Sequence, residues 1–300
     1  MSNSTNYNDY GLSRYIPTDI AREIRQKSKF GCVICRNAIY QYEHIDPEFK
    51  DAHEHDPDKI CLLCGGCHDK VSRGRISKET VLEKYKEVQS DDSIQKPFES
   101  LDLRSKHLKV SIGSNLFEHT PCIFEIDGEK ILSISPGEDQ TGFPLINGTF
   151  FDNNGQEIFR ISDNIWKGPL DLWDIEIQGR KTTIKSVPKK VALEFEIIPP
   201  DQINITKIDM IKDNCHIVCK KDQILIGQLS NKNNVYIGLN GFQCKGANIG
   251  IQVDSRKLSN PNPTGLKMVG GKGIVLEGTG IHVGKNSGQM IIGGLQLIKG

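Results

Sequence analysis

The chain contains 300 residues, of which 37% are hydrophobic, and its 38 basic and 38 acidic side chains balance at neutral pH. No apolar run approaches the roughly 20 residues that a membrane-spanning helix requires, and residues 1–16 lack the apolar core of a signal peptide. Residues 1–90 are balanced as well, with fourteen basic and fourteen acidic side chains, so net charge does not indicate nucleic-acid binding. We therefore expect a cytoplasmic protein of one to three domains that has no membrane attachment.

Helical signals are confined to the first part of the chain. Residues 1–16 are rich in Ser, Asn and Tyr and predict a flexible tail. Thr18 is a suitable N-cap for a helix whose apolar side chains recur at i and i+4, so residues 18–27 predict a short amphipathic helix. This helix would open a first domain at residues 17–90.

Three further elements are expected before the composition changes. Residues 39–46 predict a strand or one arm of a hairpin, and residues 65–72 predict a short helix. Ser77 can cap another helix that runs to about residue 89, and its single apolar stripe is expected to face the core. Residues 91–99 have no periodicity and predict a linker.

Beyond the linker, short β-branched or aromatic runs alternate with Gly, Pro, Asn and Asp. This spacing is typical of an antiparallel sandwich or barrel. The predicted strands cover residues 108–112, 122–126, 130–134, 148–151, 157–161, 172–177, 182–186, 191–198, 214–220 and 223–229. Residues 100–300 are therefore expected to form a β-rich domain, with a possible sub-boundary near residues 230–265.

The end of the chain is rich in glycine. Residues 265–300 contain eleven glycines interleaved with short apolar runs. Such runs fit the rungs of a small solenoid, exposed strands that pair with another subunit, or a plain glycine-rich meander. The second alternative would make the protein a homo-oligomer through its β domain.

The most specific chemical signal is a pair of Cys-x-x-Cys motifs. Cys32 and Cys35 form the first motif, and Cys64 and Cys67 form the second after 28 intervening residues. Each short loop turns two sulfurs toward one point, as a tetrahedral structural zinc ion requires. The chain has nine cysteines, an odd number, so a disulfide framework is the weaker interpretation.

Two neighbours of the second motif are competing metal ligands. Cys61 and His68 crowd around Cys64 and Cys67 in the sequence. We favour Cys64 and Cys67 because they complete two equal motifs, and we place Cys61 on a buried strand. His68 is then available for chemistry, although a role as a zinc ligand stays open.

Around these motifs the chain resembles the HNH nuclease family. Three segments match the family pattern in order and approximate spacing, within about residues 20–90. They are FGCVIC at residues 30–35, YEHIDP at residues 42–47 and LLCGGCHDKV at residues 62–71. The resemblance implies two short strands and a helix that fold around a catalytic metal and are held by a four-cysteine zinc site.

The resemblance also implies roles for three side chains. His44 would be the general base that activates water, while Glu43 and His68 would ligate a catalytic divalent metal, expected to be Mg or Mn. Neighbouring residues on a strand point to opposite sides, and which of Glu43 and His44 faces the metal stays open. The implied partner is DNA, expected to be double-stranded.

One position departs from the family pattern. The family usually has an asparagine five residues before the third zinc cysteine, where it pins the loop that orients the base, and this chain has Lys59 there. Lysine cannot form the same paired amide hydrogen bonds, but its ammonium could contact a phosphate. Lys70, Arg73 and Arg75 are the other candidate phosphate contacts, against the alternative of a solvated helix end.

Two more histidines lie in an acidic segment between the motifs. His53 and His55 have the spacing of extra metal ligands. Because Asp and Glu surround them, we expect a solvated loop and give them no catalytic role.

The sequence therefore predicts an α+β protein in which a small zinc-bound ββα-metal domain precedes a mainly antiparallel β domain with a glycine-rich end. The expected function is a metal-dependent DNA endonuclease that the β domain targets, oligomerises or regulates, as in a bacterial defence or restriction-type effector. Two alternatives remain: a catalytically decayed zinc scaffold, or a protein whose main activity is binding of a carbohydrate, peptide or phage component by the β domain. A regulatory ligand would bind that domain, and the sequence predicts no chemical class for it.

Overall fold

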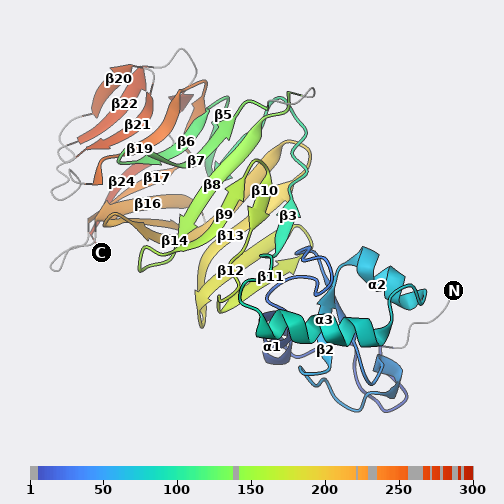
Figure 1. Cartoon of the computed structure of the whole chain (residues 1–300). Helices are drawn as coiled ribbons and strands as arrows, with labels where there is room; N and C mark the ends of the chain where they lie inside the picture. Colours follow the sequence, from blue (N-terminus) through green and yellow to red (C-terminus); the bar gives the residue numbers. More distant parts are fainter. Residues whose placement is uncertain are drawn as a thin grey trace. The chain divides into compact units, whose positions relative to one another are not determined.

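The structure is a computed structural model that describes residues 6–137, 142–220, 222–228, 235–255, 266–270, 272–277, 280–285, 290–291 and 294–299. It is mixed α+β, with few helices and mostly antiparallel strands, which confirms the predicted class (Figure 1). The chain forms two compact units. The first contains Met1–Glu99 and Lys167–Ile177, and the second contains Ser100–Trp166 and Gln178–Gly300. None of the described helices is long and apolar enough to cross a membrane.

The first unit is built from helices and one hairpin. Its elements are α1 (Thr18–Lys27), β1 (Gln41–His44), the 3-10 helix η1 (Phe49–Asp51), β2 (Ile60–Leu63), α2 (Gly65–Ser72) and α3 (Lys78–Ser90). The three predicted helices are confirmed, and Ser77 caps α3 by accepting a hydrogen bond from the Thr80 N–H. The predicted cap of α1 is wrong. Pro17 holds an extended ψ of 144°, and the helix starts directly after it at Thr18.

Strand β2 lies between two apolar clusters. It pairs with β1 in antiparallel register, from Gln41 opposite Leu63 to His44 opposite Ile60. Because side chains alternate along a strand, Cys61 and Leu63 join the cluster that contains the apolar stripe of α3. Ile60 and Leu62 pack instead with Ile24 of α1. All four residues of β2 are buried, so this strand fixes both helices relative to β1.

A distant segment completes the first unit through a buried ion pair. The guanidinium of Arg25 on α1 donates from Nε to Asp174 Oδ1 at 2.7 Å and from a terminal nitrogen to Asp174 Oδ2 at 2.8 Å. The other terminal nitrogen donates to the Tyr42 hydroxyl at 2.7 Å. Both charged side chains are only 2% exposed. Burial opposes the charge of Arg25, but the hydrogen bond with Asp174 leaves its pKa above the ordinary value.

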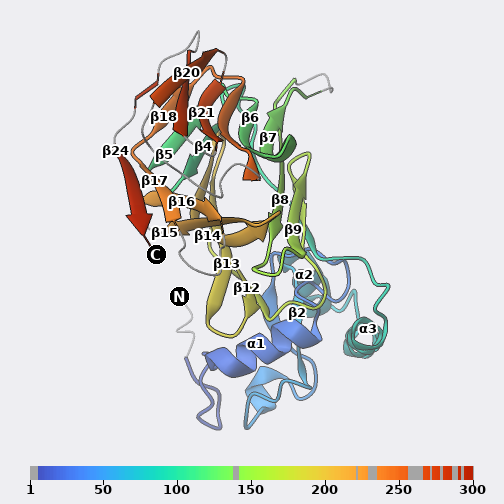
Figure 2. The same ribbon diagram turned by 90° about the vertical axis from the view of Figure 1, so that its left-hand side faces the viewer.

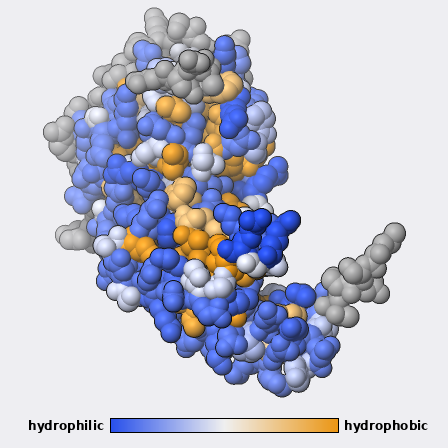
Figure 3. Space-filling model, turned by 45° about the vertical axis from the view of Figure 1, so that its right-hand side comes forward, coloured by the Kyte–Doolittle hydropathy of each residue, from blue (hydrophilic) through white to orange (hydrophobic). Residues whose placement is uncertain are grey.

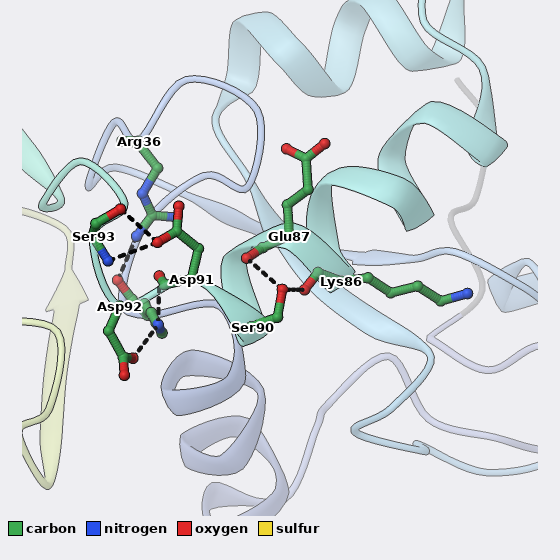
Figure 4. A network of polar contacts seen from close by, with 8 residues as sticks. Arg36, Lys86, Glu87, Ser90, Asp91, Asp92 and Ser93 are labelled. Atoms are coloured by element: carbon green, nitrogen blue, oxygen red, sulfur yellow. Dashed lines mark hydrogen bonds and ion pairs between the residues drawn. The ribbon is translucent and has the colours of Figure 1, made fainter.

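The segment after α3 is tied to the first cysteine loop. The Lys29 ammonium donates to the Asp91 carbonyl and to Asp92 Oδ1, both at 2.9 Å. Figure 4 shows Asp91 and Asp92 together with Arg36 and with Ser93, whose N–H and hydroxyl both donate to Asp91 Oδ1. The predicted linker at residues 91–99 thus begins with a hydrogen-bonded turn.

The second unit consists of β-strands. They are β4 (Lys109–Ile112), β5 (Asn115–Glu118), β6 (Cys122–Ile126), β7 (Glu129–Ser135), β8 (Leu145–Phe151), β9 (Glu157–Ser162), β10 (Ile165–Lys167), β12 (Lys181–Val187), β13 (Lys190–Ile198), β14 (Gln202–Lys212), β15 (Cys215–Lys220), β16 (Gln223–Gln228), β17 (Val235–Asn240), β18 (Gln243–Lys245), β19 (Ile249–Val253), β20 (Leu266–Gly270), β21 (Lys272–Glu277), β22 (Gly280–Lys285), β23 (Met290–Ile291) and β24 (Gly294–Lys299). At the sequence boundaries between the units lie β3 (Phe98–Ser100), the last residue of β10, and β11 (Asp174–Gln178).

Two sheets organise these strands, as Figure 2 shows from a second side. One sheet has the order β20-β22-β21-β19-β6-β7-β8-β9-β10, and the other has the order β23-β18-β5-β4-β14-β15-β16-β17-β24, with β13 and β12 attached through β14. Apolar side chains of β6, β7 and β8 line a small cavity together with those of β4, β14, β15 and β16. The inner faces of the two sheets therefore pack on each other as a sandwich.

The glycine-rich end extends both sheets. Strands β20, β21 and β22 continue the sheet of β19, whereas β24 pairs with β17 and β23 pairs with β18. Because these strands divide between two sheets, the solenoid alternative is wrong. The face drawn in Figure 3 is mainly hydrophilic, with smaller groups of hydrophobic residues between the hydrophilic ones.

The longest described strand, β14, lies outside the predicted strands. Its buried residues alternate in two halves, Ile203 with Ile205 and then Ile208 with Met210. The alternation shifts by one residue at Thr206, opposite a register shift in β13. A bulge of this kind breaks the period-two pattern on which strand prediction depends.

The buried ion pair of the first unit predicts a local loss of stability. Asp174→Asn should lower the free energy of opening of α1 by about 3 kcal/mol, because Arg25 would stay buried without its carboxylate. Hydrogen exchange of the α1 amides, followed by mass spectrometry, measures this opening. The control is Glu23→Gln, which removes an exposed i,i+4 partner of Lys27 and should change the opening free energy by less than about 0.5 kcal/mol. Equal effects of the two substitutions would contradict the prediction.

Candidate active site

The four predicted zinc cysteines converge in the first unit. The Sγ atoms of Cys32, Cys35, Cys64 and Cys67 all lie within 4.8 Å of one another, and those of Cys35 and Cys64 are 3.5 Å apart. A zinc ion that binds four thiolates at about 2.3 Å holds its sulfurs about 3.8 Å apart. The cluster thus fits a structural zinc ion. Cys61 lies on β2 outside the cluster, with no exposed surface, as the sequence predicts.

Strand β2 brings the two cysteine loops together. The Val33 N–H donates to the Leu62 carbonyl at 3.0 Å, which ties the first loop to this strand. The second loop follows β2 directly, because Cys64 is the N-cap of α2 and its Sγ accepts a hydrogen bond from the Cys67 N–H at 3.4 Å. Both loops are therefore anchored to one buried element.

A buried arginine holds the first loop in shape. Arg36 is 4% exposed, and in the described part of the chain its guanidinium donates to backbone carbonyls. The acceptors are the carbonyls of Ser28, Lys29, Gly31, Cys32 and Gln95. Burial lowers the pKa of Arg36 to about 10, and the nearby thiols of Cys32 and Cys35 oppose that change.

The thiols differ in acidity. Burial raises the pKa of Cys35 to about 11, and burial and the neighbouring Cys32 also raise the pKa of Cys67. The pKa of Cys64 is lowered, because hydrogen bonds to its sulfur, first from the Cys67 N–H, outweigh the effect of burial. A divalent ion would have to displace protons from at least part of the cluster.

Two of the three predicted catalytic residues meet at the junction of β1 and α2. The Glu43 carboxylate lies 3.0 Å from His68 through its Oε2 and the imidazole Nε2. Its other oxygen, Oε1, pairs with the ammonium of Lys78 at the start of α3. The same ammonium donates to the His44 carbonyl at 2.7 Å. Glu43 is largely buried, with a side-chain exposure of 13%, while His68 is 36% exposed.

His44 makes its contacts with a different group of side chains. Its Nε2 lies 3.3 Å from His55 Nδ1, and its ring lies 5.4 Å from the ring of Phe49. Burial, followed by the positive neighbours His55, Lys78 and Arg14, lowers the pKa of His44 to about 4. The imidazole is therefore neutral at pH 7 with a free lone pair, although the lowered pKa makes it a weaker base than an ordinary histidine.

The prediction of a solvated loop is wrong for His55. This residue is 8% exposed, because one ring nitrogen contacts His44 and the other lies 2.8 Å from the Ser13 carbonyl. His53 is exposed, and its ring centre lies 3.9 Å from that of Tyr10, with the two ring planes tilted by 44°. The acidic composition of the loop conceals which of the two histidines is buried.

The candidate phosphate contacts are exposed. Lys59 lies 3.5 Å from Asp56, and Arg73 lies 2.9 Å from Asp69. Lys70 and Arg75 are also exposed, on either side of the end of α2. Weak exposed ion pairs such as these leave the cations accessible to an anionic ligand.

Two residues of the site have little sequence signal. Lys78 follows a helix cap, where a charged residue is ordinarily solvated, and only the fold brings it to Glu43. His55 is one of two histidines in an acidic segment, and its partner Ser13 lies 42 positions away. A pairing at that distance has no periodic pattern that could reveal it.

Comparison with known proteins identifies no relative. Neither family models, nor curated proteins, nor solved structures match the chain significantly.

The cysteine cluster predicts the zinc content of the protein. The purified chain should carry about one zinc ion, and Cys64→Ser should lose most of it because three sulfurs hold zinc less tightly than four. Zinc is measured by mass spectrometry of the desalted protein. The control is Cys61→Ala, on the preceding strand and outside the cluster, which should keep its zinc. Full zinc in Cys64→Ser would show that this thiol is not a ligand.

Proposed function

We propose that the first unit is a metal-dependent endonuclease of the HNH type that hydrolyses phosphodiester bonds in DNA. The observation that carries the proposal is the 3.0 Å contact between Glu43 and His68, made where a hairpin meets a helix. His44 is the neighbour of Glu43 on the same strand, and the four-cysteine cluster holds the start of α2 that carries His68. The order of β1, β2 and α2 supports the proposal.

The pair Glu43 and His68 suits a divalent metal. Two adjacent ligands at about 2.1 Å from an octahedral ion lie about 3.0 Å apart, which is the distance between Glu43 Oε2 and His68 Nε2. One carboxylate and one imidazole are compatible with Mg or Mn. Such an ion supplies stabilisation of the charge on the phosphoryl group and the leaving oxygen.

The protein would supply the proton transfer and the positioning. His44 is the proposed general base, because its neutral imidazole can take a proton from the attacking water. The ammonium of Lys78 contacts both the Glu43 carboxylate and the His44 carbonyl. It would therefore hold the proposed metal ligand and the proposed general base in fixed positions relative to each other. Lys59, Lys70, Arg73 and Arg75 are the proposed contacts to DNA phosphates.

The second unit is proposed to direct the nuclease. A site that addresses only the DNA backbone has no means of choosing a sequence, so targeting, oligomerisation or regulation would fall to the β sandwich. The last strand of one sheet order, β24, is a candidate edge for pairing with a second copy. A bacterial defence or restriction-type effector is the role that we propose for the whole chain.

A second candidate function is a zinc-held scaffold without catalysis. Lys78 pairs with an oxygen of Glu43 that a metal could use, and Lys59 replaces the family asparagine. These two cations favour the scaffold, whereas the Glu43 to His68 geometry favours the nuclease.

A plasmid assay tests the nuclease. The zinc-loaded full chain should nick supercoiled plasmid with Mg or Mn at low ionic strength, and His44→Ala should reduce the rate by about 10²–10⁴-fold, the usual contribution of a general base. The control is His107→Ala, an exposed histidine of the second unit, which should cut at the parental rate. No cutting by the parent under any metal would favour the scaffold.

The role of His68 can be separated from zinc binding. His68→Ala should keep the zinc content of the parent, because the cluster contains four cysteines without it, but should lose metal-dependent cutting. Zinc analysis and the plasmid assay are run on the same preparation. Loss of zinc together with cutting would instead make His68 part of the structural site.

A further inference from the structure

The N-terminal residues 6–15, which we call the arm, form a compact turn over the loop that follows β1. The Asn8 N–H donates to the Leu12 carbonyl at 2.9 Å, and the Arg14 N–H donates to the Asn6 carbonyl at 2.8 Å. Gly11 closes the turn with a φ of 78°, a conformation that favours glycine. The arm thus has hydrogen bonds of its own.

One side chain of the arm pins the loop. The Asn8 amide nitrogen donates to the Phe49 carbonyl at 2.7 Å and to the Ala52 carbonyl at 2.6 Å. Its oxygen accepts from the Tyr10 and Leu12 N–H groups inside the arm. Both donor sites of the amide group therefore join the arm to the loop, and both acceptor sites are used within the arm. The guanidinium carbon of Arg14, 4.4 Å from the centre of the Phe49 ring, adds a second contact.

The contact with the arm also sets the position of the proton on a neutral His55 and, through it, on His44. A carbonyl oxygen only accepts, so the 2.8 Å contact between Ser13 O and His55 requires a proton on His55 Nε2. A neutral His55 then presents an unprotonated Nδ1. The 3.3 Å contact with His44 is completed when His44 Nε2 carries the proton and donates it. His44 is left with its lone pair on Nδ1.

We propose that His55 and the arm are positioning elements for His44, and that they hold its imidazole in the tautomer whose Nδ1 is the base. The inference rests on the proposed nuclease for its role, but the tautomer itself is independent of activity. In the described part of the chain, the hydrogen bonds of the His44 ring are confined to Nε2. The His44 ring also makes a T-shaped contact with the ring of Phe49, and the arm holds Phe49 through Asn8 and Arg14.

This arrangement provides a pinned loop without the family asparagine. Lys59 stands at that position, and its side chain is exposed beside Asp56. Asn8 supplies two amide hydrogen bonds to the loop from outside the matched segments. The departure at Lys59 therefore does not leave the loop unsupported.

The test measures the tautomer directly. Nitrogen-15 NMR of the full zinc-loaded chain distinguishes protonated from unprotonated ring nitrogens, and His44→Ala identifies the His44 signals. In the parent, His44 should carry its proton on Nε2. In His55→Leu, which removes the acceptor, the signals should move toward a mixture of the two tautomers. His107→Leu, the same change at an exposed histidine of the second unit, should leave them unchanged.

The plasmid assay adds a measurement of activity to the test. His55→Leu should lower kcat roughly 10- to 100-fold with KM unchanged, less than the ~10²–10⁴-fold contribution of the base itself. His55→Asn, whose amide oxygen can replace Nδ1 as an acceptor, should recover part of this loss. Asn8→Asp, which keeps the acceptor within the arm but loses both donors to the loop, should show a smaller loss of the same kind. Zinc content checks that each variant is folded.

The outcomes separate the two proposals. A tautomer that is fixed in the parent and mixed in His55→Leu supports the positioning role even if no variant cuts DNA, in which case the nuclease alone fails. A His44 proton on Nδ1 in the parent overturns the positioning role, as does an unchanged tautomer in His55→Leu with full cutting.

Discussion

Four thiols of the first unit converge on one point, and this convergence constrains how the other elements of the unit are placed. Both cysteine loops depend on β2: the first through the hydrogen bond from Val33 to Leu62, and the second because Cys64 follows the strand directly. Glu43 pairs with Cys61 across the hairpin, and His68 lies one helical turn beyond Cys64. A cluster that fixes the start of α2 against the end of β2 thereby sets the distance between these two side chains. The cysteines of the cluster and the proposed metal ligands are different residues, but both sets are positioned by β2.

In the described part of the first unit, charged side chains are buried where they have several polar partners. Arg25 has a carboxylate and a hydroxyl, Arg36 has a ring of carbonyls, and Glu43 lies between an imidazole and an ammonium. Each satisfied group offsets the cost of leaving water, and each also restricts neighbouring chain segments. The proposed site is assembled in this way from the arm, the hairpin, the loop after β1, and two helices. Such a site depends on rigid polar contacts more than on an apolar pocket.

Local patterns in the sequence predict the elements that have a regular period. The helices at 18–27, 65–72 and 77–89, the cysteine cluster and most of the strands follow from spacing alone. Strand β14 is not predicted because a bulge at Thr206 shifts the alternation of its apolar residues by one position. Two contacts, of His55 with Ser13 and of Lys78 with Glu43, are not predictable from the sequence for another reason. They join residues that are distant in sequence, and their residue types occur on any solvated surface.

The first unit is discontinuous, and this has a consequence for the order in which the protein is made. Arg25 emerges from the ribosome long before Asp174, which lies 149 positions further along the chain. Until that residue is synthesised, the buried face of α1 lacks the carboxylate that neutralises it. Completion of the N-terminal unit therefore waits for a segment that is encoded inside the β region. No single division of the sequence separates the two units. A chain that ends before residue 167 would lack part of the N-terminal unit.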